Sequence, residues 1–312
     1  MLGMLPGTNA QIKGIPKENY DSLVNLELQM QGQAESTIDG PDQSTRKTSC
    51  YSLIRNLVVA LKLKGSFYYP FDSLRQISIL TAPDNTFRIF TWNYRNDKDA
   101  YRFYGVIQRN GEDGNSSTFP LFDAGPLIKR AEDTVVDNNF WWGALYYASI
   151  PVKVGTETYY TLLGWNGASA KSNKKVIDVL RWQEGIPTFG APIFKAGPND
   201  IMHRVVFEYS NDVKSMVLEY VPEKKYIVFD HLIPLSAKAE GIYELYFPDG
   251  SYDYFSFEKG YWILNEKLFD NGTIKTANDN IEQRSKKIKP KTPPKEPKDD
   301  KKEDEKKENE GN

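Results

Sequence analysis

Three carboxylates are the first candidates for chemistry, because each lies within an apolar stretch of the chain. They are Asp178 in "VIDVL", Glu208 in "VVFEYS" and Asp230 in "IVFDHL". Glycan hydrolysis uses two carboxyl groups about 5–10 Å apart, one protonated as the acid and the other acting as base or nucleophile. The sequence does not by itself bring any two of these residues together. A carboxylate-dependent hydrolase acting on a glycan or related polymer is therefore the alternative interpretation.

Tryptophans are the second group of candidates. Trp141 and Trp142 lie in "FWWGALYY", Trp165 in "GWNG" and Trp182 in "VLRW". Exposed aromatic rings near carboxylates such as Asp178 form stacking platforms for sugars or protein side chains. Packing in the core is the default interpretation for all four. Trp165 is expected to be the most exposed of them, because its neighbouring glycines indicate a turn.

Strand periodicity decides how two further groups are interpreted, because neighbours on a strand point to opposite faces. Arg204, Val206 and Glu208 share one face, and a solvated face is the default there. The alternative is that Arg204 and Glu208, too far apart for an ideal ion pair, bracket a neighbouring group as a binding site. Asp230 and His231 point to opposite faces, so adjacency does not make them a catalytic dyad. We expect His231 to be a hydrogen-bonded core residue.

Several classes of site are not expected. One cysteine, Cys50, allows no internal disulfide, and two histidines, His203 and His231, are too few for a typical zinc site. The chain has no G-x-S-x-G, no G-x-x-x-x-G-K-[ST] and no G-x-G-x-x-G motif. Its S-x-x-K matches are expected by chance in a lysine-rich sequence. We therefore predict no metal and no other cofactor.

The elements that must position these residues change character along the chain. The segment "CYSLIRNLVVALKLKG" has apolar residues three and four apart and predicts a helix that ends at Gly65. Cys50 lies on its apolar stripe and is expected to be a small buried residue rather than a nucleophile. Residues 20–31 predict a second helix, although Leu26, Leu28 and Met30 also alternate as in a strand.

From Ser73 the apolar period becomes two, and turn residues recur at short intervals. We expect five hairpins, with turns at residues 83–85, 155–157, 166–173, 222–224 and 248–250. About twelve strands joined in this way predict an all-β, antiparallel multi-hairpin body, irregular propeller-like or multi-sheet, with one or two N-terminal helices. The strand–turn–strand units resemble propeller blades, but the turn prolines show no constant repeat, so a regular propeller is not demonstrable. A closed barrel is the less favoured architecture.

Charge and hydropathy limit the partners. Lys and Arg total 40 against 42 Asp and Glu, so no field of one sign attracts nucleic acid, and none is expected as a partner. The longest apolar stretch, "FWWGALYYASIPV", is shorter than the roughly 20 residues of a spanning helix, so no transmembrane segment is expected. Residues 285–312 are rich in lysine, carboxylates and proline, which predicts a disordered tail.

The first residues resemble the end of a secretory signal. Thr8 and Ala10 have the small side chains found before a cleavage point, after an apolar stretch. We therefore divide the chain into a signal-peptide remnant (1–10), an N-terminal helical segment (11–65), an all-β domain (66–284) and the disordered tail (285–312). The sequence predicts an exported protein, periplasmic or associated with the cell envelope.

Four segments carry a resemblance to a family of uncharacterised exported bacterial proteins. They are "LTAPDNTFRIFTWNY", "YYTLLGWNGASAKSNKKVIDVL", "HRVVFEYS" and "MVLEYVPEKKYIVFDHL". The resemblance covers about Ser66 to Lys267, implies export and supplies no catalytic residue. A non-enzymatic binding or scaffold module is then the favoured function, with an envelope protein or a glycan as its partner.

Overall fold

The computed structural model describes residues 14–266 of the chain. The expected signal remnant (1–10) and the expected tail (285–312) lie outside the described residues. Two long helices come first, α1 (Lys17–Asp39) and α2 (Gln43–Lys62). Both predicted helices are therefore confirmed, and the segment that also alternated like a strand is helical.

Local signals explain where these helices begin and end. The Asp42 side chain caps α2 by accepting a hydrogen bond from the Thr45 backbone N–H at 2.8 Å. After α2 the chain turns at Gly65, whose φ of +82° favours glycine. A Cβ at Gly65 would lie 2.6 Å from the carbonyl oxygen of Gly14, so a side chain there would push the two segments apart.

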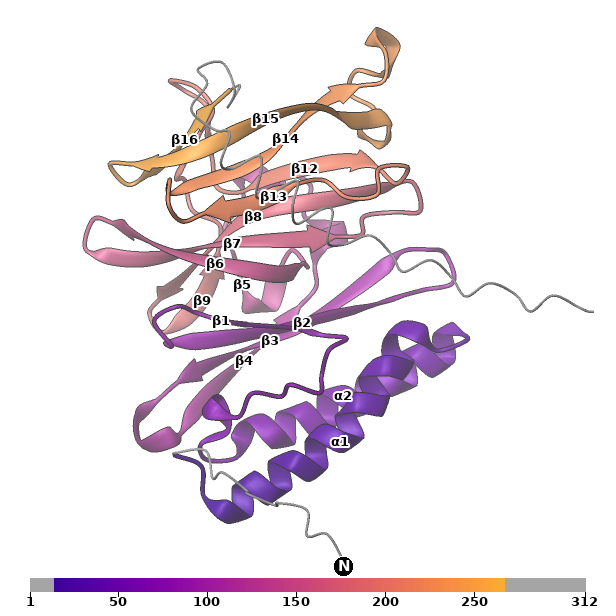
Figure 1. Ribbon diagram of the computed structural model, residues 1–312, viewed down its shortest axis with the longest axis vertical. Coiled ribbons are helices and arrows are strands. Elements are labelled where there is room, and N and C mark those ends of the chain that lie inside the picture. The colour runs from indigo at the N-terminus through magenta and orange to yellow at the C-terminus, as the bar shows by residue number, and fades with distance from the viewer. Residues whose placement is uncertain (1–13, 267–312) are drawn as a thin grey trace, which may run out of the picture. The chain divides into compact units, whose positions relative to one another are not determined.

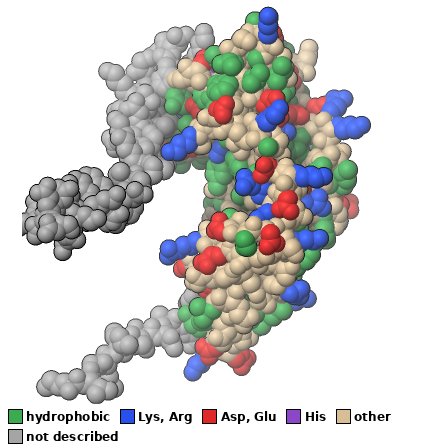
Figure 2. Space-filling view, turned by 90° about the vertical axis from the view of Figure 1, so that its right-hand side faces the viewer, with side chains coloured by type: hydrophobic (Ala, Val, Ile, Leu, Met, Phe, Trp, Pro, Cys, Tyr) green, Lys and Arg blue, Asp and Glu red, His purple; other side chains and the backbone are tan. Residues whose placement is uncertain are grey.

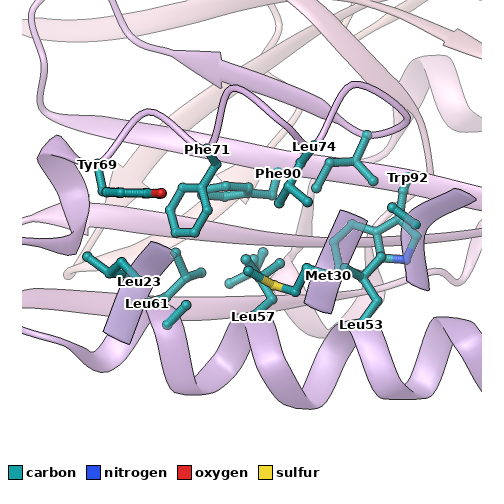
Figure 3. Packing of buried hydrophobic residues seen from close by; sticks show 14 of the residues in the cluster. Leu23, Met30, Leu53, Leu57, Leu61, Tyr69, Phe71, Leu74, Phe90 and Trp92 are labelled. Atoms are coloured by element: carbon teal, nitrogen blue, oxygen red, sulfur yellow. The ribbon is translucent and has the colours of Figure 1, made fainter. Parts of the chain in front are cut away.

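The helices pack against each other and against the first sheet. The first sheet has the strand order β1-β2-β3-β4. Its strands are β1 (Ser78–Thr81), β2 (Phe87–Arg95), β3 (Tyr101–Asn110) and β4 (Ser116–Phe122). Figure 3 shows Leu23 and Met30 of α1 and Leu57 of α2 facing Phe90 of β2. Cys50 is fully buried in this cluster, as predicted.

The second sheet has the order β5-β9-β8-β7-β6, and β12 pairs with β8 beside this path. Its strands are β5 (Val136–Asp137), β6 (Leu145–Val154), β7 (Glu157–Asn166), β8 (Ser172–Gln183), β9 (Ile186–Phe189) and β12 (Val205–Ser210). The third sheet has the order β11-β10-β16-β15-β14-β13. Its strands are β10 (Phe194–Lys195), β11 (Ile201–Met202), β13 (Leu218–Val221), β14 (Tyr226–Pro234), β15 (Tyr246–Glu258) and β16 (Tyr261–Asn265).

The layers of residues 14–266 follow one another as helices, first sheet, second sheet and third sheet (Figure 1). One hydrophobic cluster fills each space between neighbouring layers. The second sheet is therefore covered on both faces, and residues 176–180 of β8 are buried without interruption. The multi-sheet all-β body with two N-terminal helices is confirmed, and the described residues form no closed barrel.

Two details of the predicted topology are wrong. The sheets are not antiparallel throughout, because β10 and β16 pair in parallel after the chain crosses from the second sheet to the third. The expected turn at residues 248–250 is not a hairpin either, since β15 continues through it. The pairing jumps from Leu232↔Pro248 to Asp230↔Tyr252, so the extra residues around Gly250 form a bulge.

The surface charges and the character of the helices agree with the expectations from charge and hydropathy. On the face shown in Figure 2, basic and acidic side chains are interspersed, and neither sign forms a continuous patch. Within residues 14–266 no helix combines the length and the apolar character that a bilayer-spanning helix requires.

Candidate functional site

Asp178 and Arg204 form an ion pair inside the molecule. Arg204 Nε lies 3.0 Å from Asp178 Oδ1, and both side chains are fully buried. The Tyr146 hydroxyl donates to Asp178 Oδ2 at 2.8 Å, and the backbone N–H of Val179 donates to Oδ1 at 2.8 Å. Both carboxylate oxygens of Asp178 therefore have partners in the cluster between the first and second sheets.

This buried network extends to Trp141 and to the segment before β5. Trp141 Nε1 donates to the Tyr146 hydroxyl at 3.1 Å, and Arg204 Nη1 donates to the Ala131 carbonyl at 2.7 Å. Burial raises the pKa of Tyr146 well above its usual value. The expected solvated face is therefore wrong for Arg204, because it lies under the segment that contains Ala131. The network therefore joins strands of the second sheet to the segment before β5, and its side chains are buried.

Glu208 occupies a different environment on the same face of the sheet. Its Oε2 lies 3.2 Å from Lys174 Nζ, and its Oε1 accepts from the Ser172 hydroxyl at 2.5 Å. The Lys174 and Glu208 side chains are 28% and 26% exposed, so this pair can be reached from solvent. The pairing of β12 with β8 creates the contact, since Glu208 lies opposite Lys174.

Beside this ion pair lies a hollow of about 430 Å³, which we call the Glu208 cleft. Its walls come from β3, from residues 123–132, from the loop after β7 and from β8 and β12. Its lining includes Tyr101, Phe103, Asp123, Trp142, Lys174 and Glu208. Aromatic rings and charged side chains of both signs therefore meet in one concave site, which is typical of ligand sites.

Asp123 lines the cleft, but its oxygens are already engaged. Oδ2 accepts from the Phe103 N–H at 3.1 Å and Oδ1 from the Gly125 N–H at 2.9 Å. A Cβ at Gly143 would lie 2.7 Å from Oδ1, so this oxygen is also tightly packed. Burial raises the pKa of Asp123 despite these hydrogen bonds. Asp123 therefore stabilises the backbone of the cleft wall, and its oxygens are not free to bind a ligand.

A second hollow of about 340 Å³ shares Tyr101 and Ser169 with the cleft. Arg95, Asn173 and Asn211 line it, and Asn173 Nδ2 donates to Asn211 Oδ1 at 2.5 Å. Its lining is almost entirely polar. An extended ligand could therefore pass Tyr101 from an aromatic part of the site to an amide-rich part.

The four candidate tryptophans separate into two pairs. Trp141 and Trp142 are buried in the cluster between the first and second sheets, and Trp142 also lines the cleft. Trp165 and Trp182 are half-buried. The Trp165 ring packs edge-on against Tyr101 with centroids 5.4 Å apart, so it contacts a residue that lines the cleft. Trp182 lies elsewhere, under the Arg109 guanidinium at 4.6 Å.

Asp230 belongs to the third sheet and is not part of the cleft. It is 6% exposed, and its Oδ2 accepts from the Val217 N–H at 2.7 Å. Burial raises its pKa. Asp230 and His231 form no dyad, because His231 Nδ1 instead lies 2.7 Å from Asp253 Oδ2 on β15. The expectation of a core histidine is only partly met, since the His231 side chain is 40% exposed.

The His231–Asp253 contact gives the fold a pH dependence. The hydrogen bond that the protonated His231 ring donates to Asp253 raises the pKa of His231 above its usual value of 6.5. A raised pKa means that the stabilisation is fully present below about pH 6.5 and is lost as the pH rises through the folded value. We expect the urea midpoints of the protein and its His231→Gln variant to differ more at about pH 5.5 than at about pH 8.5. A difference that does not change with pH, or one matched by His203→Gln, would contradict this.

Sequence reasoning found Glu208 and Trp142 but missed Lys174, Tyr101 and Asp123. Lys174 gave no signal, because only the pairing of β8 with β12 brings it to Glu208. Tyr101 had one indirect signal in Gly167. A Cβ at Gly167 would lie 2.4 Å from the Tyr101 ring, so that glycine leaves space for it. Within residues 14–266 no group of three or more His, Cys, Asp or Glu side chains is placed to hold a metal ion.

Comparison with known proteins identifies no relative of this chain. No family model, no curated protein and no solved structure matches the chain. The function is therefore argued from the geometry of the cleft.

Proposed function

We propose that the protein is a non-enzymatic binding module of the cell envelope and that the Glu208 cleft holds its ligand. The observation that carries this proposal is the reachable ion pair between Lys174 and Glu208 beside the rings of Tyr101 and Trp142. A charged pair can exchange hydrogen bonds with a polar ligand, while the rings cover its apolar faces.

The spacing of the carboxylates supports binding over hydrolysis. Asp178 lies four residues beyond Lys174, the register partner of Glu208, which is about 13 Å along a strand. Glycosidase pairs lie about 5–10 Å apart and need access to the bond they break. Asp178 is fully buried, and Asp230 belongs to another sheet. Of the three predicted carboxylates, Glu208 alone lines the cleft, and the oxygens of Asp123, which also lines it, already accept backbone hydrogen bonds.

The backbone of the cleft supports a recognition role as well. Ala168, in the loop after β7, has a φ of +27°, which is rare for a residue with a side chain. Hydrogen bonds hold this conformation. The Ala168 N–H donates to Asn166 Oδ1 at 2.8 Å, and Asn166 Nδ2 donates to the Gly143 carbonyl at 2.7 Å. These bonds hold the rim of the cleft in a fixed shape before a ligand arrives.

The envelope assignment rests on the sequence. Thr8 and Ala10 fit a signal cleavage site, and four segments resemble exported bacterial proteins. The partner is then a glycan or a protein of the envelope. The row of Tyr101, Ser169 and Asn173 along two adjoining hollows favours the glycan, because sugars combine stacking faces with many hydroxyls.

A titration with soluble envelope glycan fragments, followed by calorimetry, tests the proposal. We expect Lys174→Ala and Glu208→Gln each to weaken binding by about tenfold or more, which corresponds to about 1.4 kcal/mol. Lys153→Ala is the matched control, since Lys153 is an exposed lysine of the same sheet outside the cleft.

Two results would overturn the proposal. If no variant of the cleft changes binding of either glycans or envelope proteins, the cleft is not the site. If the protein hydrolyses the glycan and Glu208→Gln abolishes turnover without unfolding it, the alternative function, a carboxylate-dependent hydrolase, replaces the binding module.

A further inference from the structure

Arg88 is a buried cation without a carboxylate partner. It lies on β2, on the face that packs against the helices, and is 3% exposed. The ion pairs found among residues 14–266 do not include it. Burying a charge without a counter-charge is unfavourable, so such a residue needs an explanation.

Neutral acceptors satisfy only part of its donor capacity. Nε donates to Gln108 Oε1 at 2.7 Å, Nη1 to the Tyr69 carbonyl at 2.7 Å and Nη2 to the Ser66 carbonyl at 2.6 Å. A guanidinium has five N–H groups, so one remains on each terminal nitrogen. Two parallel N–H groups of this kind match the two oxygens of a carboxylate.

A cavity lies beside these donors. It measures about 510 Å³, and Arg88 is part of its lining, so we call it the Arg88 cavity. Phe67, Phe71 and Ile79 provide apolar wall, and Asp72 contributes a carboxylate. A volume of this size is within the range of small-molecule sites.

Aromatic rings hold the guanidinium in place. Its Cζ lies 5.4 Å from the ring centre of Phe67, 5.1 Å from Phe71 and 4.8 Å from Phe90. Figure 3 shows Phe71 and Phe90 side by side next to Tyr69, between the first sheet and the helices. Ring faces attract a cation, but they do not neutralise it. Burial accordingly lowers the pKa of Arg88 to about 9.

We propose that the Arg88 cavity binds a small organic monocarboxylate, whose two oxygens accept the free N–H groups of Arg88 and whose apolar body lies against Phe67, Phe71 and Ile79. The exposed carboxylate of Asp72 favours a ligand with one negative charge over a dianion such as phosphate. This site is separate from the Glu208 cleft and does not depend on the function proposed for it.

Calorimetry or ligand-observed NMR on the full chain tests the site with benzoate and hexanoate. Benzamide and hexanamide are matched neutral probes, and inorganic phosphate is the dianion. We expect the carboxylates to bind at least tenfold more tightly than the amides and phosphate. Amides that bind as well as carboxylates, or no carboxylate binding at millimolar concentration, would overturn the proposal.

Substitutions at Thr81 test the role of Arg88 without removing it. Thr81 is exposed, lines the cavity and lies directly opposite Arg88 on β1. Residues paired in this way have Cβ atoms about 5 Å apart, so the carboxylate of Thr81→Glu can reach the guanidinium. We expect Thr81→Glu to weaken benzoate binding at least tenfold, whereas the neutral Thr81→Gln changes it less than threefold. Equal effects of the two variants would show that Arg88 only ties the chain segment around Ser66 and Tyr69 to the sheet.

Discussion

Replacing Asp178 by asparagine is expected to lower the free energy of unfolding by about 3–5 kcal/mol, because it leaves a buried guanidinium without its counter-charge. Asp178 and Arg204 are both fully buried, and their Oδ1–Nε distance is 3.0 Å. The same substitution disturbs the hydrogen bond from Tyr146. Urea denaturation followed by tryptophan fluorescence measures the change.

The Lys174–Glu208 pair provides the control for this prediction. It has a similar N···O distance, 3.2 Å, but its side chains are about a quarter exposed, at 28% and 26%. Water screens such a pair, so Glu208→Gln should cost only about 0–1 kcal/mol. Asp178→Asn combined with Arg204→Met should lose less than the two single changes added together. If Asp178→Asn costs no more than Glu208→Gln, burial of the Asp178–Arg204 pair does not make it important for stability.

The sequence predicted those parts of the fold that depend on neighbours along the chain. The helices followed from apolar spacing, and the turns at residues 83–85, 155–157, 166–173 and 222–224 connect paired strands as expected. Turn residues and alternation act over a few positions, so they are visible locally. The turn at 248–250 failed because its partner, β14, extends past it and pairs with both halves of β15.

Pairings between distant segments could not be predicted in this way. β12 joins β8 across about thirty residues of sequence, and the parallel pairing of β10 with β16 spans more than sixty. Patterns within a few residues do not determine which distant strand a strand will pair with. The cleft depends on the first of these pairings, so Glu208 could be predicted as a candidate but its partner Lys174 could not.

Asp178 shows where a signal was present but was interpreted differently. Its neighbours in "VIDVL" are apolar on both strand faces, which is typical of a strand covered on both sides. A carboxylate in that position must be paired inside the protein rather than offered to a ligand. Glu208 lies in a mixed stretch next to Tyr209 and Ser210, and it is the carboxylate that solvent reaches.

The second large effect is expected at Trp141, where alanine should lower the free energy of unfolding by about 3–5 kcal/mol. Trp141 is fully buried, its ring packs against Tyr146 and Phe189, and its Nε1 donates to the Tyr146 hydroxyl at 3.1 Å. Truncation removes this hydrogen bond and leaves a cavity next to the Asp178 network. Thermal or urea denaturation measures the loss, and Trp141→Phe should recover part of it by refilling the space.

Trp165→Ala should behave differently, because Trp165 is half-buried and supports Tyr101 at the cleft. We expect a smaller loss of stability than at Trp141 but a loss of ligand binding of about tenfold, since the Tyr101 ring is no longer held in place. Trp182→Ala is the matched control: Trp182 is also half-buried and packs against Phe119, but it lies outside the cleft. Its loss should lower stability and leave binding unchanged. If Trp165→Ala and Trp182→Ala weaken binding equally, the effect comes from general loosening of the sheets, and the cleft geometry does not determine recognition.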